Sequence, residues 1–504
     1  MKKSVRLYCI LSAVFIPLSL FITINQVPWI DEVSIGDTPA HFLLYGKWFT
    51  TDTTNPSIYI SLYQPLYSFL WLVWSKFVGF SIMSSRMFNL ILEFLLGLYL
   101  ICLYKKITKE SLSVYQTAVF TYLFYLGCIM IPSLRGRVEI LCALLMVLFL
   151  IKCTDFMLRI KYSSIWLFGL ATAIIMTGIQ ATVTLLAVLI YGAIFYYHEM
   201  RKVIKVFALY IGGSLFGLTL CTFFFAYFGL AKVYLGNVFF YSGTFRKIYA
   251  LVAPYIGDTN DKYGIINQVT EGSDFLTKFV EGINRHPTFE FLLIGTIMFI
   301  IVFISKPKVG LKSKGVIAYL VSLAILVTLL VAGRYTSYYQ YFVVVPMSLA
   351  LGLWADEGKI WLSRTALLCC IIYIATIVYP VTNKITETGY NNLKCFVERN
   401  EHIIGKNDNI ASPHSLFYEL KPRYKNIFFT ELYPCDSIEN LKFIFMPGHD
   451  IKSDQFSSYY NTKGMESFFN KIITDSTYSI SLVDSLAYPQ LRLYRIERFS
   501  NKVR

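Results

Sequence analysis

The stretch that decides the fold is residues 87–106, which read MFNLILEFLLGLYLICLYKK: an apolar run of membrane-spanning length that ends in two lysines. A helix needs about 20 predominantly apolar residues to cross the hydrocarbon core of a bilayer. One acid, Glu93, interrupts the run, and an acid inside a span either has a function or pairs with a neighbouring helix. The segment predicts a transmembrane helix with a cytoplasmic lysine end.

The same pattern recurs along most of the chain. Of its 504 residues, 56% are hydrophobic and 15% are charged, and the mean hydropathy is +0.54. A soluble protein of this size could not bury so much apolar side chain in its cores. We therefore predict a polytopic α-helical membrane protein with about eleven spans. The predicted spans are residues 7–24, 87–104, 112–131, 138–156, 164–179, 181–197, 204–228, 289–305, 315–332, 340–355 and 363–379.

The basic residues between these runs fix the direction of the chain. They cluster in every second turn, as Lys105, Lys106 and Lys109; Lys152, Arg159 and Lys161; Arg201, Lys202 and Lys205; Lys306, Lys308, Lys312 and Lys314; and Lys359 and Arg364. By the positive-inside rule these turns and the N-terminus lie in the cytoplasm. The pattern predicts an inner (plasma) membrane protein among membrane lipids, and it explains the net charge of +15 without nucleic acid.

Two points in this topology have alternatives. The first run follows Lys2 and Lys3 and could be a cleaved signal peptide, but residues 21–26 offer no small-x-small cleavage site, so we predict an uncleaved span. Residues 164–197 could form one long tilted helix. That choice would put the lysine-rich segment 306–314 outside, so two helices are predicted.

The sequence predicts two domains. Residues 1–380 form the transmembrane domain with large outward loops at 25–85 and 230–288, and residues 381–504 form a small extracytoplasmic α/β domain. Within the first loop, Leu66–Phe80 suits a helix that lies in the membrane interface. In the second domain the pattern predicts strands at Ile410–Leu420, Leu441–Met446 and Leu491–Glu497, and helices at 389–404 and 463–474. Whether Cys395 and Cys435 form a disulfide stays open.

Three acids follow the first span closely: Asp31, Glu32 and Asp37. Carboxylates clustered at a membrane surface repel one another, so at least one pKa should rise, and such a group could take a proton from a sugar hydroxyl. His41 could assist. The alternative is a solvated turn in which Asp37 caps a new helix and Pro39 stands near its first position.

Arginines also occur on the outward side, where positive charge is otherwise avoided. Arg135, Arg137 and Glu139 lie between the third and fourth spans, and Arg334 lies between the ninth and tenth with Tyr335, Tyr338 and Tyr339. Guanidinium groups suit bidentate contacts with phosphate. The alternative is that each arginine reaches lipid headgroups or pairs with Glu139.

These motifs together resemble GT-C membrane glycosyltransferases, in the bacterial branch related to protein O-mannosyltransferases and lipid A aminoarabinose transferases. The first loop, from Asp31-Glu32 through Asp37-Thr38-Pro39 to Gly46-Lys47-Trp48, is similar to the first periplasmic loop of that family. Tyr63-Gln64-Pro65-Leu66-Tyr67 and Arg137-Val138-Glu139 resemble its Tyr-Pro-Pro-Leu-Tyr and Arg-Pro-Glu/Asp motifs, each with one proline replaced. The turn Gly333-Arg334-Tyr335 with Tyr338-Tyr339 is similar to a late outward turn of the family.

The resemblance implies transfer of a sugar from a polyprenyl-phosphate carrier to an acceptor hydroxyl on a glycan, lipid or protein outside the cytoplasm, with inversion. It implies Asp31 as general base, assisted by Glu32 and Asp37, and Arg137, Arg334 and Arg135 as ligands of the donor phosphate. His41, Tyr335, Tyr338, Tyr339 and Glu139 then contact the substrates. No metal-ligand spacing appears, although the three acids could bind a divalent cation. The sugar and the acceptor are open.

A second function class fits a polytopic membrane protein: a transporter or flippase of lipid-linked saccharides. Transporters bind their substrates on broken helices near the bilayer midplane, within repeated halves. This sequence shows no internal repeat, its polar clusters fall on one predicted face, and a soluble domain is predicted on that face. These features favour the enzyme.

Overall fold

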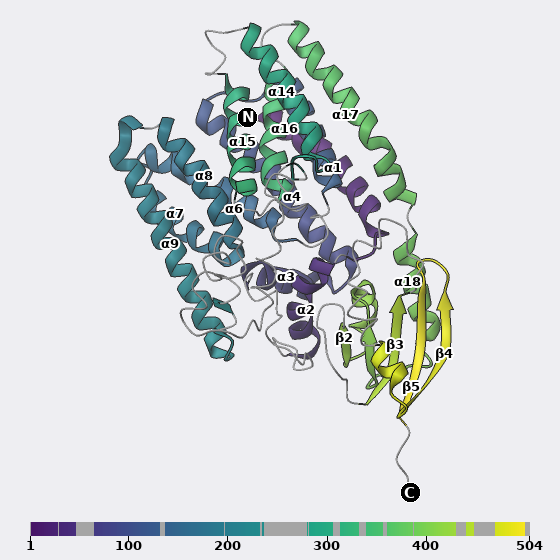
Figure 1. Ribbon diagram of the computed structural model, residues 1–504. Coiled ribbons are helices and arrows are strands. Elements are labelled where there is room, and N and C mark those ends of the chain that lie inside the picture. The colour runs from purple at the N-terminus through teal and green to yellow at the C-terminus, as the bar shows by residue number, and fades with distance from the viewer. Residues whose placement is uncertain are drawn as a thin grey trace, which may run out of the picture. The chain divides into compact units, whose positions relative to one another are not determined.

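The computed structural model describes most helices and the C-terminal sheet (Figure 1). The described residues are 2–28, 30–46, 65–131, 137–195, 197–231, 234–235, 280, 282–305, 313–331, 339–355, 360–386, 388–429, 440–447 and 469–498. Most of the predicted outward loop at 230–288 and most of the lysine-rich segment 306–314 lie outside them.

Each predicted span falls on a helix. Within the described residues, five helices are long and apolar enough to cross a membrane by length and composition, and six shorter apolar helices accompany them. The prediction of a polytopic helical protein is confirmed. The helices are α1 (Lys2–Ile24), α4 (Ile82–Thr108), α5 (Val114–Met130), α6 (Glu139–Met157), α7 (Ser163–Thr177), α8 (Ile179–Phe195), α9 (Met200–Tyr227), α14 (Thr288–Ser305), α15 (Lys314–Val331), α16 (Gln340–Trp354) and α17 (Ile360–Thr386).

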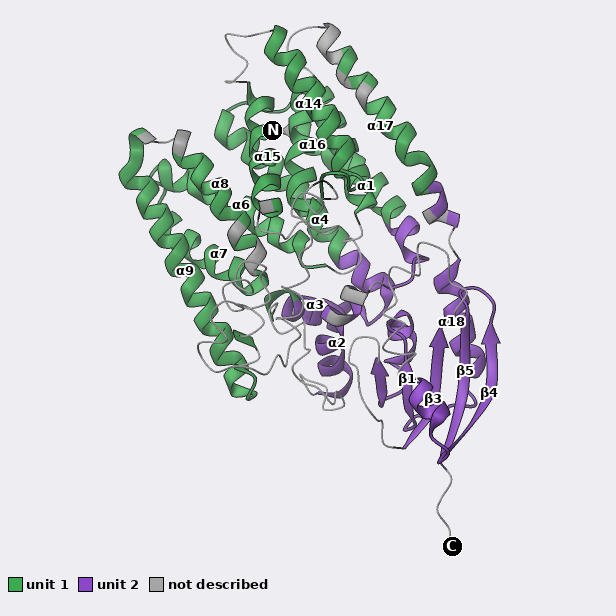
Figure 2. Cartoon of the chain, in the orientation of Figure 1, with its two compact units in different colours: residues 1–19, 62–67, 89–381 green, residues 20–61, 68–88, 382–504 purple. Residues whose placement is uncertain are grey.

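The chain divides into two compact units (Figure 2). Unit 1 comprises residues 1–19, 62–67 and 89–381, and unit 2 comprises residues 20–61, 68–88 and 382–504. The first outward loop and the C-terminal domain therefore belong to the same unit, although hundreds of residues separate them in the sequence.

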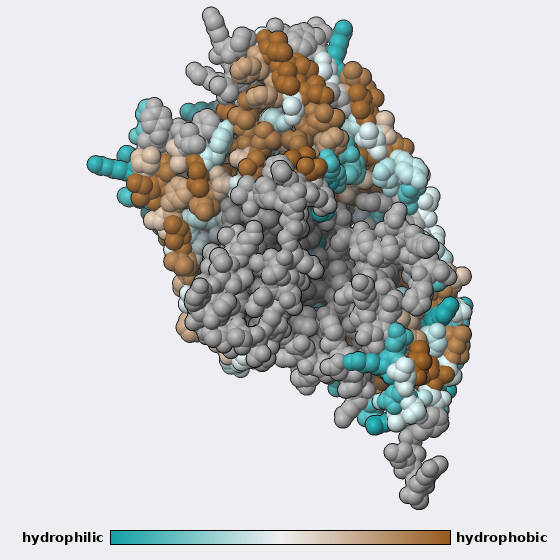
Figure 3. Space-filling view, viewed as in Figure 1, coloured by the Kyte–Doolittle hydropathy of each residue, from teal (hydrophilic) through white to brown (hydrophobic). Residues whose placement is uncertain are grey.

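Unit 1 is a bundle of apolar helices. The two helices predicted at 164–179 and 181–197 are present as α7 and α8, and Gly178 lies between them. Close packing of α7 on α9 depends on a second glycine, Gly213: a Cβ there would lie 2.4 Å from the carbonyl oxygen of Phe168. Small residues allow such backbone approach between membrane helices. Large apolar side chains such as Ile165 and Phe223 remain exposed on the bundle, whose surface is brown in Figure 3, as expected for helices in lipid.

Unit 2 begins where α1 ends and contains α2 (Ile30–Tyr45) and α3 (Pro65–Val78). Helix α3 confirms the predicted helix at Leu66–Phe80. The indole N–H of Trp71 donates to Ser85 Oγ at 3.1 Å, and that of Trp74 donates to the carbonyl oxygen of Ser84 at 2.9 Å. The two tryptophans thus join α3 to the first turn of α4.

The C-terminal domain of unit 2 combines a helix, α18 (Gly389–Asn400), with a mixed five-stranded sheet in the order β2-β1-β3-β5-β4. Helix α18 and a helical turn at 469–474 agree with the predicted helices, although residues 463–468 lie outside the described part. The strands are β1 (Asn409–Ser412), β2 (Ile427–Phe429), β3 (Leu441–Pro447), β4 (Tyr478–Leu486) and β5 (Leu491–Arg498). Strand β1 is parallel to β2 and β3, whereas β5 is antiparallel to β3 and β4.

One strand prediction was wrong in part. Only residues 410–412 of the predicted strand Ile410–Leu420 are extended, as part of β1. Pro413 has no N–H for a ladder, and the chain turns there into η7 (His414–Leu416) and α19 (Phe417–Leu420). The apolar side chains of this segment are buried in helical turns, which a short apolar run does not distinguish from a strand.

Candidate functional site

Helix α2 carries Asp31, Glu32 and Asp37, so these three acids do not form a turn. Asp37 lies in the middle of the helix and Pro39 lies inside it, so Asp37 does not cap a new helix. Successive residues of an α-helix are rotated by about 100° around its axis. Positions 31, 32 and 37 therefore lie on three different sides of α2, and Glu32 and Asp37 meet different neighbours.

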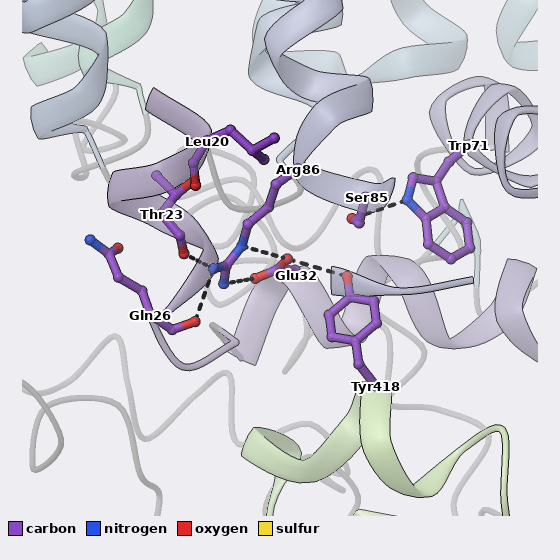
Figure 4. Close-up of polar contacts among 8 residues, drawn as sticks. All are labelled: Leu20, Thr23, Gln26, Glu32, Trp71, Ser85, Arg86 and Tyr418. Atoms are coloured by element: carbon purple, nitrogen blue, oxygen red, sulfur yellow. Dashed lines mark hydrogen bonds and ion pairs between the residues drawn. The ribbon is translucent and has the colours of Figure 1, made fainter. Parts of the chain in front are cut away.

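Glu32 forms a buried ion pair with Arg86, at the start of α4 (Figure 4). The Arg86 guanidinium donates to Glu32 Oε2 at 3.1 Å, and both side chains are almost fully buried. The hydroxyl of Tyr418 donates to Glu32 Oε1 at 3.2 Å. Glu32 is thus held by a residue of α4 and a residue of the C-terminal domain.

Arg86 also completes the end of the first helix. Its Nη1 donates to the carbonyl oxygen of Gln26 at 2.9 Å and to that of Thr23. The last carbonyls of a helix have no partner within the helix and carry partial negative charge. Figure 4 shows the guanidinium between these carbonyls and Glu32, so this cation fixes α2 against the end of α1.

Asp37 is paired with a cation of the C-terminal domain. Lys421 follows α19, and its Nζ lies 2.8 Å from Asp37 Oδ1. Only 2% of the Lys421 side chain and 4% of the Asp37 side chain are exposed. Lysine is almost never fully buried without a partner, so this contact accounts for the burial of both groups.

The remaining predicted residues of α2 are Asp31 and His41, one in each half of the helix. His41 is buried and its ring lies 5.1 Å from that of Tyr45, between ring centroids. The hydroxyl of Tyr45 donates to the carbonyl oxygen of Lys421 at 2.7 Å. Asp31 stands in the first turn of α2.

Two predicted residues of unit 1 form their own ion pair. Arg137 donates to both carboxylate oxygens of Glu139, at 3.0 and 2.7 Å, and both residues are buried. The structure thus contains the pairing that was the alternative to a phosphate site at Arg137. Tyr339, just before α16, is buried and stacks on Phe342 with ring centroids 6.3 Å apart. The other predicted residues, Arg135, Arg334, Tyr335 and Tyr338, lie outside the described part of the chain.

Sequence reasoning missed three members of this cluster: Arg86, Tyr418 and Lys421. Arg86 had a detectable signal, because it is a cation at the outward end of a predicted span, where lysine and arginine are rare. Tyr418 and Lys421 had none, since their contacts with α2 cross more than 380 residues of sequence. We call Glu32, Asp37, Arg86, Tyr418 and Lys421, with position 31, the acidic-helix site.

Within the described residues, no group of three His, Cys, Asp or Glu side chains is placed to hold a metal ion. Glu32 and Asp37 instead have guanidinium and ammonium partners. A site of this kind holds carboxylates in fixed positions at low net charge.

Comparison with known proteins gives structural neighbours only. No protein-family model matches the sequence, and no curated protein does. Among solved structures, ArnT from Cupriavidus metallidurans in the apo state is similar over 97% of both chains, with 10% identity and a TM-score of 0.40. The same protein bound to undecaprenyl phosphate is similar over 97% of both chains, with 10% identity and a TM-score of 0.41.

Proposed function

We propose that this protein is a glycosyltransferase that moves a sugar from a polyprenyl-phosphate carrier to an acceptor hydroxyl on the extracytoplasmic face of the membrane. The N-terminus is then cytoplasmic, and the C-terminal domain, residues 381–504, faces the other side. The proposal rests on the order of the motifs along the chain and on the acidic-helix site.

The observation that carries the proposal is that two of the three acids of α2 are held in place by cations. Glu32 and Asp37 are held by Arg86 and Lys421 in buried ion pairs. Position 31 faces another side of the helix, since it is rotated by about 100° from position 32. By the family resemblance, Asp31 is the acid of this helix that we assign to proton transfer, while the other two fix the helix on which it stands.

The chemistry requires one base and one cation. In the proposed reaction the acceptor oxygen bonds to the anomeric carbon, the bond from that carbon to the carrier phosphate oxygen breaks, and Asp31 takes the acceptor proton. A phosphate leaving group departs without a proton, so no general acid is needed. Arg137, Arg334 and Arg135 are assigned to the departing phosphate, and nearby carboxylates stabilise the oxocarbenium-like transition state.

The substrate contacts in this proposal follow the family pattern. His41, Tyr335, Tyr338, Tyr339 and Glu139 are assigned to contacts with the substrates. A divalent cation is not required by this mechanism, because protein cations already neutralise Glu32 and Asp37.

The test supplies purified protein in detergent or nanodiscs with a panel of polyprenyl-phosphate sugars and with candidate acceptors. We expect release of polyprenyl phosphate and a product of inverted anomeric configuration, measured by mass spectrometry and NMR. Comparison of envelope glycans with and without the protein identifies the sugar and acceptor to supply. Vesicles that move a lipid-linked saccharide across the bilayer without ever releasing carrier phosphate would refute the enzyme and support a transporter.

A further inference from the structure

The C-terminal domain reaches the acidic helix through one short segment, residues 413–421. The segment leaves the sheet at the end of β1 and forms η7 and α19, and η7 lies against α2. The ring of Phe417 packs over Gly36, where an added Cβ would lie 3.6 Å from it. The same ring meets Phe80 edge-on, with centroids 5.5 Å apart. The segment is thus packed on α2 and on the residues that lead into α4.

Two polar side chains of this segment end on acids of α2. Tyr418 donates to Glu32, as Figure 4 shows, and Lys421 pairs with Asp37. Both residues are buried: Tyr418 is 4% exposed and Lys421 is 2% exposed. Burying an ammonium group costs free energy unless an opposite charge compensates it. Since Lys421 is almost fully buried, the carboxylate of Asp37, and not water, compensates the charge of its ammonium group.

The neighbouring acid of the segment, Glu419, is held by its own domain instead. It accepts from the Tyr390 hydroxyl at 2.7 Å and pairs with Arg423 at 2.7 Å. Burial, and then the nearby Glu419, raise the pKa of Tyr390 well above its usual value, so this hydroxyl stays a hydrogen-bond donor. In contrast to Glu419, Tyr418 and Lys421 direct their polar groups to acids of α2.

We propose that Tyr418 and Lys421 are positioning residues of the acidic-helix site. By holding Glu32 and Asp37 on two sides of α2, they fix the rotation of the helix about its axis and so the place of Asp31. This assignment rests on the proposed function for its effect on catalysis. It makes the C-terminal domain a required part of the site, beyond any contact with the acceptor.

The pairing is tested without any activity, by a double-mutant cycle in thermal unfolding. Asp37→Asn, Lys421→Met and the double variant are compared with Lys425→Met, a change to an exposed lysine four residues after Lys421. We expect each single variant to lower the unfolding midpoint and the double variant to lower it by less than the sum, because removing both charges leaves neither unpaired. Lys425→Met should leave the midpoint unchanged. Additive effects would overturn the pairing.

The positioning role is tested by carrier phosphate release. We expect Lys421→Met to lower kcat by roughly tenfold or more, with the donor KM nearly unchanged, since a displaced base affects the chemical step more than binding. Lys421→Arg should restore most of the rate, because it keeps the charge, and Tyr418→Phe should give a smaller loss. A Lys421→Met protein that folds and keeps its full kcat would refute the positioning role. No release by the unaltered protein would refute the proposed function, while the thermal cycle still decides the pairing.

Discussion

The buried cation Arg86 offers the sharpest test of how unit 2 is held together. Its side chain is 0% exposed and contacts Glu32 and the carbonyl oxygens of Thr23 and Gln26. The change to test is Arg86→Leu, which keeps apolar volume and removes every one of these contacts. It leaves Glu32 as a buried carboxylate whose cation is lost, and two carbonyls at the end of α1 lose their donor.

The magnitude follows from the contacts. Removing one partner of a buried ion pair costs about 3–5 kcal/mol, and each lost hydrogen bond to a buried carbonyl adds about 1 kcal/mol. For a unit of about 150–250 residues, 1 kcal/mol shifts the midpoint by roughly 2–4 °C, so Arg86→Leu should lower it by about 10 °C or more. Arg86→Lys keeps the charge without the planar guanidinium group. Its unfolding midpoint should therefore lie between those of the unaltered protein and Arg86→Leu.

The assay is thermal unfolding of the detergent-purified protein, followed by size-exclusion chromatography of the heated samples. The matched control is Arg492→Leu, an exposed arginine on β5 of the same unit. A double variant, Glu32→Leu with Arg86→Leu, should be more stable than Arg86→Leu alone, because no unpaired charge remains. A midpoint of Arg86→Leu within about 2 °C of the unaltered protein would refute the structural role given to this ion pair.

Three further predictions concern other parts of the molecule. Gly213→Ala should destabilise unit 1, because its Cβ would meet the carbonyl of Phe168, whereas Gly169→Ala has open space and should leave the thermal midpoint unchanged. Partial burial alone would raise the pKa of Asp484, but hydrogen bonds from neighbouring groups lower this pKa overall. The ionised Asp484 therefore stabilises the fold above about pH 4, and this stabilisation is lost as the pH falls further. Asp484→Asn should therefore lower the midpoint at pH 7 and weaken its fall below pH 4, measured by melts across pH. Glu93→Leu should be better tolerated than Glu93→Gln in the same melts, because the buried carboxyl oxygens of Glu93 have no hydrogen-bond partner within the described residues, and an apolar side chain removes the cost of burying such groups.

The helices of this protein could be predicted from sequence because a membrane span depends on local properties. Length and apolar composition suffice to find a helix such as α4, and Gly178 marks the break between α7 and α8. The predicted strand at Ile410–Leu420 failed in part because a short apolar run fits a buried helical turn equally well.

Of the acidic-helix site, only the acids that lie close together in the sequence could be predicted. The acids of the first loop were recognised from their spacing, but their separation around α2 required the knowledge that they lie on a helix. The partners of Glu32 and Asp37 were out of reach, because Arg86 and Lys421 are brought to them by the tertiary fold. Such long-range pairs leave no periodic pattern in a single sequence.

The central claim is that Asp31 removes the acceptor proton during sugar transfer. The most direct measurement is the single-turnover rate of carrier phosphate release by Asp31→Asn, compared with Asp475→Asn, which alters an exposed acid of the C-terminal domain. General-base catalysis contributes about 10²–10⁴-fold, so we predict a loss of that size for Asp31→Asn and an unchanged rate for Asp475→Asn. A folded Asp31→Asn protein that releases carrier phosphate at the rate of the unaltered protein would contradict the account.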